Sequence, residues 1–176
     1  MLTRQKEMTA EEFLAYEEEH DIQLFNFANG KVVEIKATGT RGRIASECMF
    51  ALYDYAQSNS IGKAYGRVLH VLDGKMCQPD TCIHNDLDKQ DDTKDYFITA
   101  PLAAVEIQAD PLTKSDQRQK ALAYINNGTK LLVLSFPGEG LEVFRPDREP
   151  LALTYGDMLD GDDVLPGFRV KVDGLL

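Results

Sequence analysis

Apolar residues follow two different spacings along this chain. Helical spacing, with apolar residues three or four positions apart, predicts helices over about residues 10–19, 43–57 and 115–127. Short apolar runs bounded by turn residues predict strands, which lie over residues 22–27, 31–36, 64–72, 75–83, 102–107, 130–134 and 141–144. Asn29-Gly30 and Asp73-Gly74 are typical of tight hairpin turns. Strands interspersed with helices favour an α/β fold, in which helices flank a mixed β-sheet.

Several boundaries of these elements can also be predicted. Thr9 is a typical N-cap for the first helix, and Ser115 can cap the third, which Gly128 closes. The glycines and arginines of 39–43 favour a flexible turn leading into the long helix. The acidic stretch 86–95 is expected to be a solvated loop.

Glu106 is the most informative position, because a glutamate inside a short apolar strand is unfavourable to bury without a partner. Strand alternation places it on one face with Leu102, Ala104 and Gln108, opposite the face that carries Val105. If both faces are covered, Glu106 needs a cation, a proton or strong hydrogen-bond donors. The alternative is that it lies near the strand end, where its carboxylate reaches water.

Asp80, Lys120 and Glu34 add candidate chemistry. Asp80 follows Pro79, where aspartate usually belongs to a turn, but paired with Glu106 from a neighbouring strand it can offer two carboxylates to one Mg²⁺. Lys120, on the helix after the Glu106 strand, can reach back to orient a water or neutralise charge on a phosphoryl group; otherwise it is an ordinary surface lysine. Glu34 can supply a further carboxylate.

Composition narrows the class of protein. The 176 residues include 43% hydrophobic residues, enough for one core, and no apolar stretch long enough to span a membrane. We see no signal peptide at the N-terminus, and three cysteines are too few for a disulfide framework, so we expect a cytoplasmic protein. The net charge of −10 argues against general affinity for nucleic acids without excluding a local basic groove.

Six stretches together resemble the Uma-two family of restriction endonucleases, which is abundant in cyanobacteria and other bacteria and has the PD-(D/E)XK nuclease fold. They are T-A-E-E-F-L-A-Y (9–16), N-G-K-V-V-E (29–34), Pro79-Asp80, A-V-E-I (104–107), K-A-L-A-Y-I-N-N-G (120–128) and G-D-D-V-L-P-G-F (161–168). They cover nearly the whole chain, and the last two are the more specific ones.

The resemblance implies one restriction-endonuclease-like domain over residues 1–176, with a four-stranded mixed core sheet, a homodimer, and Mg²⁺- or Mn²⁺-dependent hydrolysis of DNA. Asp80 and Glu106 fall on the family's metal-binding positions, Lys120 on its helix lysine and Glu34 on an accessory acidic position. We expect the carbonyl of Ile107 to complete the metal site. Gln108 stands where the family motif has a lysine, and we expect it to position the attacking water.

The surroundings of these residues depart from the family pattern. The turn after the glutamate is Gln108-Ala109-Asp110-Pro111, without the usual serine, and Arg41-Gly42-Arg43 lacks a histidine often found where the long helix begins. The strand after the third helix ends in Ser135-Phe136-Pro137 instead of Asp-Pro.

Three functions follow as hypotheses. The first is a metal-dependent endodeoxyribonuclease. It would be supported if one groove beside the site were lined by Lys36, Arg41, Arg43, Lys114 and Arg118, whereas a scattered arrangement would count against DNA. The second is a catalytically degenerate, dimeric binding or regulatory module on the same fold. The third is a metal-dependent hydrolase of a smaller phosphoester, which the acidic composition would tolerate.

Overall fold

The structure, a computed structural model, describes residues 7–19, 24–28, 31–85 and 94–176. A mixed six-stranded sheet with the strand order β10-β9-β8-β7-β6-β3 organises it. Its strands are β3 (Lys63–Gly66), β6 (Thr81–His84), β7 (Ala103–Ile107), β8 (Leu131–Phe136), β9 (Gly140–Phe144) and β10 (Leu151–Leu153). The central pair β7 and β8 is parallel, whereas their outer neighbours run antiparallel. The α/β prediction is confirmed, but the sheet has six strands where four were implied.

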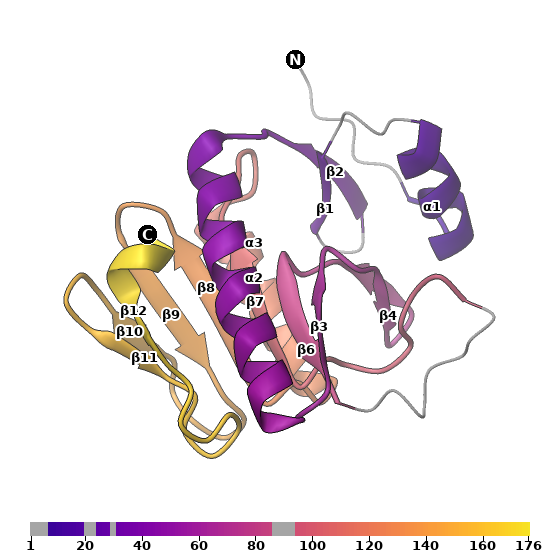
Figure 1. Cartoon of the computed structure of the whole chain (residues 1–176). Coiled ribbons are helices and arrows are strands. Elements are labelled where there is room, and N and C mark those ends of the chain that lie inside the picture. Colours follow the sequence, from indigo (N-terminus) through magenta and orange to yellow (C-terminus); the bar gives the residue numbers. More distant parts are fainter. Residues whose placement is uncertain (1–6, 20–23, 29–30, 86–93) are drawn as a thin grey trace.

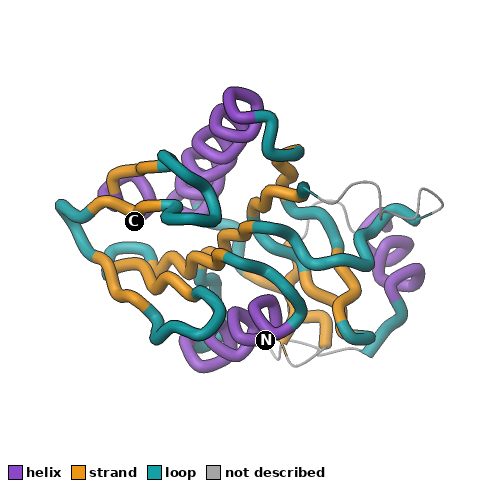
Figure 2. Tube along the Cα trace, turned by 90° about the horizontal axis from the view of Figure 1, so that it is seen from below, coloured by secondary structure: helices purple, strands orange, loops and turns teal. Residues whose placement is uncertain are grey.

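Two long helices cover the two faces of this sheet (Figures 1 and 2). Helix α2 (Gly39–Asn59) packs on the face that carries Val105 and Ile107, and helix α3 (Lys114–Asn126) packs on the face that carries Ala104. The side chains of β7 therefore alternate as predicted, and all five of its residues are buried. Because both faces are covered, a polar side chain in β7 has no access to bulk water.

A smaller layer lies on the β3 side of the main sheet (Figure 1), and it contacts α3 through Asn26 and Lys120. Helix α1 (Ala10–Glu19) packs its buried Phe13 against the hairpin of β1 (Leu24–Ala28) and β2 (Lys31–Ile35). Antiparallel pairing places Asn26 opposite Val33 and Phe25 opposite Glu34. Asn26 therefore lies on the other face of the hairpin from Phe25 and Glu34. The predicted Asn29-Gly30 turn lies outside the described residues.

The second predicted hairpin is divided into two units. β4 (His70–Leu72) and β5 (Lys75–Cys77) pair around Asp73-Gly74, where both residues have positive φ, as expected for this turn. β3 and β6 instead pair with each other in the main sheet. The chain leaves the sheet at Arg67, which has a φ of 42°, and returns after Pro79-Asp80. The two continuous strands predicted over 64–72 and 75–83 were therefore wrong in their length.

Two helix starts also differ from the predictions. Helix α2 begins at Gly39, with the Thr38 side chain accepting a hydrogen bond from the backbone of Arg41, so residues 39–43 are its first turn and not a flexible loop. Helix α3 is capped by Thr113 in a reciprocal capping box with Asp116, and not by Ser115. The C-terminal part contains β11 (Met158–Asp160), β12 (Arg169–Lys171) and the 3-10 helix η2 (Val172–Leu175).

Candidate functional site

Glu106 is fully buried in the middle of the molecule, on the α3 face of β7. The alternative, that its carboxylate reaches water near the strand end, is therefore excluded, and Glu106 is buried between two covered faces. Burial is the main cause that raises the pKa of Glu106, the ammonium of Lys120 opposes that shift, and the nearby Asp80 adds to it. A carboxylate in this position needs partners, and α3 supplies them.

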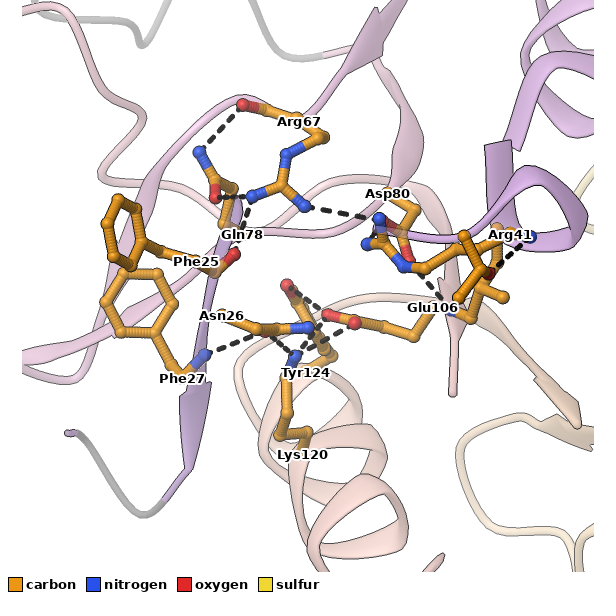
Figure 3. Close-up of polar contacts among 12 residues, drawn as sticks. Phe25, Asn26, Phe27, Arg41, Arg67, Gln78, Asp80, Glu106, Lys120 and Tyr124 are labelled. Atoms are coloured by element: carbon orange, nitrogen blue, oxygen red, sulfur yellow. Dashed lines mark hydrogen bonds and ion pairs between the residues drawn. The ribbon is translucent and has the colours of Figure 1, made fainter. Parts of the chain in front are cut away.

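Lys120 and Tyr124 lie one turn apart on α3 and both contact Glu106 (Figure 3). The Lys120 ammonium donates to the carboxylate at 2.9 Å, and the Tyr124 hydroxyl donates to it at 3.2 Å. Lys120 also donates to the side-chain oxygen of Asn26, which joins the β1–β2 hairpin to this cluster. Lys120 is only 8% exposed, so it is not the surface lysine that was the alternative.

Asp80 lies directly before β6 and is 3% exposed. Its backbone N–H donates to the carbonyl of Val105 at 3.0 Å, and its carboxylate accepts the backbone N–H of Ile107 at 2.7 Å. Because Ile107 follows Glu106 in β7, the two carboxylates belong to neighbouring strands at the same end of the sheet. Asp80 and Glu106, which we expected on neighbouring strands, are therefore close to each other in the fold.

Two arginines contact Asp80. The Arg41 guanidinium, in the first turn of α2, forms a buried hydrogen-bonded ion pair with its Oδ1 atom. Arg67 lies 3.5 Å from the same oxygen and also donates to the Phe25 carbonyl at 2.5 Å and to Gln78 at 2.8 Å. Burial is the main cause that lowers the pKa of Arg67, and Asp80 opposes that shift.

The described residues thus include a cluster of ionisable groups in which only Arg67 is half-buried and the rest are buried. We call it the carboxylate cluster: Asp80, Glu106, Arg41, Arg67 and Lys120 (Figure 3). Within it the Glu106 side chain points toward Lys120 and Tyr124, whereas Asp80 lies with the arginines. With all five ionised, the cluster holds three positive and two negative charges.

Ile107, Gln108 and Glu34 were also predicted to act in the site. Ile107 is fully buried and contributes its N–H to Asp80. The backbone of Gln108 donates to Ser135 at 2.9 Å, and its side chain is half-buried. Glu34 is not brought into the carboxylate cluster: it is exposed, and strand alternation puts it on the other face of the hairpin from Asn26.

Asp80 and Glu106 are suitable donors for a divalent cation. Two buried carboxylates on neighbouring strands are the kind of oxygen ligand that Mg²⁺ and Mn²⁺ prefer. Within 7–19, 24–28, 31–85 and 94–176, no group of three or more Asp, Glu, His or Cys side chains is arranged so that it could hold a metal ion. Other ligands would therefore come from the backbone, water or substrate, as Mg²⁺ sites commonly allow.

Two hollows reach the cluster from different sides. One, of about 380 Å³, lies between α3 and the β4–β5 hairpin and is lined in part by Lys120 and Tyr124. The other, of about 500 Å³, lies beside α2 and is lined in part by Asp80, Phe50 and Tyr53. The two aromatic side chains are 72% and 51% exposed.

The five basic residues whose arrangement tests the DNA hypothesis do not line one groove. Arg41 is buried on Asp80, and Arg43 donates to carbonyls of Gly174 and Leu176 at the C-terminus. Lys114 and Arg118 pair with Glu139 and Glu142 on the far side of the sheet from α2. Lys36 is exposed. Three of the five cations are thus paired with carboxylates and they lie on different parts of the fold, which counts against a single basic groove.

The sequence profile of the Uma2 family, described as "Putative restriction endonuclease", matches residues 10–173. The chain belongs to the Uma2 family. A crystal structure titled as a putative nuclease belonging to DUF820, from Anabaena variabilis ATCC 29413, superimposes with a TM-score of 0.77 at 18% sequence identity. The alignment covers 96% of this chain and 97% of that one, so this Uma2 protein shares its fold. No curated protein matches the chain.

Several residues of the site in this Uma2 protein were not among those predicted from its sequence. Asn26 carried the same signal as Glu106, because it is a polar residue in the apolar run Leu24–Ala28. Tyr124 was predicted only as a part of the third helix. No feature of the local sequence distinguished Arg67, whose partners Phe25, Gln78 and Asp80 are brought to it by the fold.

Among the described residues, none of the helices has the length and apolar character needed to span a membrane.

Proposed function

We propose that this Uma2 protein is a metal-dependent endonuclease that hydrolyses DNA phosphodiester bonds at the carboxylate cluster. The observation that carries the proposal is the burial of two carboxylates on neighbouring strands at one end of the sheet, with Lys120 beside them. Membership of a family described as restriction endonucleases supports the reaction class. Buried ion pairs, such as those that these carboxylates form, contribute little to stability compared with apolar residues packed in the same space. Their presence therefore favours a functional reason.

Asp80, Glu106 and the carbonyl of Ile107 would hold the cation. When bound, Mg²⁺ or Mn²⁺ would lower the pKa of a coordinated water and offset charge on the phosphoryl oxygens. The chain's own residues do the rest: Lys120 fixes the orientation of Glu106 and places a positive charge at the site, and Tyr124 holds the second side of that carboxylate. Gln108 is proposed to position the attacking water. Glu34, exposed on the far face of the hairpin, has no role in this scheme.

Cleavage of plasmid DNA tests the proposal. We expect nicking or linearisation with Mg²⁺ or Mn²⁺, and none with EDTA. Asp80→Asn and Glu106→Gln should each reduce the rate at least about a hundredfold, whereas Glu139→Gln, which removes an exposed carboxylate paired with Lys114, should not. Circular dichroism verifies that each variant is folded. Wild-type rates in the Asp80→Asn Glu106→Gln double variant would refute the assignment.

A second candidate function is a binding or regulatory module that no longer cleaves DNA. One observation favours it. Both oxygens of Asp80 already have partners, which are the two arginines and the Ile107 N–H. The absence of any Mn²⁺ binding in calorimetry, together with retained DNA binding, would favour this function over catalysis.

The remaining proposals concern the form of the protein. We propose that residues 1–176 act as one domain, that the protein is a homodimer, since two-fold dimers are the commonest assemblies, and that it works in the cytoplasm. Exposed Phe50 and Tyr53, one turn apart on α2, offer an apolar surface for a second copy. Light scattering coupled to size-exclusion chromatography would reveal the mass in solution; a monomer at all concentrations would contradict the dimer.

A further inference from the structure

Arg41 forms an ion pair with Asp80, whose carboxylate is one of the ligands of the proposed metal site. Its side chain is 7% exposed and that of Asp80 is 1% exposed, so water screens their ion pair poorly. Oδ1 of Asp80 is shared by Arg41 and Arg67, and Oδ2 accepts the Ile107 N–H. Oδ2 keeps a lone pair that can ligate a cation, but a cation there would lie a few ångströms from two guanidinium groups, and this repulsion favours the departure of one of them.

Charge counting leads to the same result. With three cations and two carboxylates, the carboxylate cluster already carries an excess of one positive charge when all its members are ionised. A divalent cation added without any rearrangement would raise this excess to three in a buried environment. Two like charges a few ångströms apart repel by several kcal/mol there, at an effective dielectric constant of about 20.

Arg41 is the partner that can leave. Arg67 is anchored by the carbonyl of Phe25 and the side chain of Gln78 in addition to Asp80. The Arg41 guanidinium hydrogen-bonds, among the residues that the structure describes, to Asp80 alone, and its buried Nε atom has no partner. Arg41 also lies in the first turn of α2, where helices fray most easily.

We propose that Arg41 is an exchangeable counter-ion of Asp80, which neutralises this carboxylate in the metal-free protein and competes with the divalent cation for it. The inference rests on the proposed metal site and adds a device that regulates its occupation. It also gives a reason for an arginine at the start of α2: without an ion, the guanidinium stabilises a buried carboxylate that would otherwise be unpaired.

Titration with Mn²⁺ alone, without DNA, tests this exchange. Calorimetry, or electron paramagnetic resonance of free Mn²⁺, gives the affinity of the wild type, Arg41→Gln and Arg41→Lys. Arg118→Gln is the matched control, because it removes the same charge from the surface of α3, where Arg118 pairs with Glu142 of β9. We expect Arg41→Gln to bind Mn²⁺ at least about tenfold more tightly than the wild type, and Arg118→Gln to bind it like the wild type.

The remaining variants separate the possible outcomes. Adding Asp80→Asn to Arg41→Gln should abolish the gain in affinity. Arg41→Lys, which keeps a charge but loses the guanidinium fork, should bind with intermediate affinity, and it provides the result if Arg41→Gln does not fold. Equal, Asp80-dependent affinity in the wild type and both variants would overturn the exchange and leave the metal site standing. No binding by any of them would overturn both.

Discussion

The ammonium of Lys120 lies 2.9 Å from each carboxylate oxygen of Glu106, and both side chains are buried. This contact joins the helix α3 to the centre of the sheet. It makes Glu106 dependent on one particular partner, because the Glu106 side chain has no access to water that could replace a lost cation.

We therefore predict that Lys120→Met is strongly destabilising. Removing one member of a buried ion pair leaves an uncompensated charge and should reduce the free energy of unfolding by about 3–5 kcal/mol at neutral pH. Urea unfolding followed by circular dichroism measures this loss. Lys114→Met is the control, since its pair with Glu139 is exposed and should contribute less than about 1 kcal/mol. Equal losses in the two variants would contradict the prediction.

The part of the site around Glu106 was predictable because local patterns determine it. Strand alternation gave the face of Glu106, and helical periodicity placed Lys120 on the segment that follows the strand. Both deductions need only the chain's own spacing and the rule that a crossover helix returns over its sheet. The burial of Glu106 then required a cation, and α3 was the nearest element able to supply one.

Tyr124→Phe should have a smaller effect than the loss of Lys120. The hydroxyl donates to Glu106 at 3.2 Å and lowers the pKa of that carboxyl group. Its removal should reduce stability by about 1 kcal/mol and raise the pKa of Glu106 further. Carbon-13 NMR of the glutamate carboxyl groups would detect the second effect. An unchanged Glu106 titration would show that the hydroxyl does not support this carboxylate.

The pH dependence of stability offers a separate test of Glu106. Burial raises its pKa in the folded protein above the ordinary value of 4.5, so the folded state holds this proton more tightly than the unfolded chain. The resulting stabilisation is complete below pH 4.5 and is lost as the pH rises through the folded-state pKa. Relative to Glu106→Gln, the wild type should therefore be most stable at low pH. If the free energy of unfolding of the wild type, relative to that of Glu106→Gln, instead increased with rising pH, the prediction would be contradicted.

The Asp80 side of the site was less predictable, because its partners come from distant parts of the chain. Arg41 was assigned to a flexible turn from the glycines around it, yet the Thr38 cap makes the same residues helical. Arg67 breaks a strand that looked continuous, and its side chain then bridges β1, Gln78 and Asp80. Local propensity describes such segments poorly when long-range ion pairs decide their conformation.

His70 gives a prediction that does not involve the proposed chemistry. It is fully buried in β4, stacks on Phe97 with ring centroids 5.2 Å apart, and contacts the Val68 carbonyl through Nδ1 at 3.0 Å. Burial, with a further contribution from neighbouring His84, lowers the pKa of His70 to about 3. The folded protein thus excludes a proton that the unfolded chain binds near pH 6.5.

The sign of the His70 effect is opposite to that of Glu106. Stabilisation by neutral His70 is complete above pH 6.5 and is lost as the pH falls toward 3, by about 1.4 kcal/mol for each pH unit. His70→Phe keeps a ring for stacking but cannot titrate. Urea unfolding of both proteins between pH 7 and 5 should show the wild type losing stability faster than the variant. Parallel curves would mean that His70 becomes protonated without unfolding the layer formed by β4, β5 and Phe97.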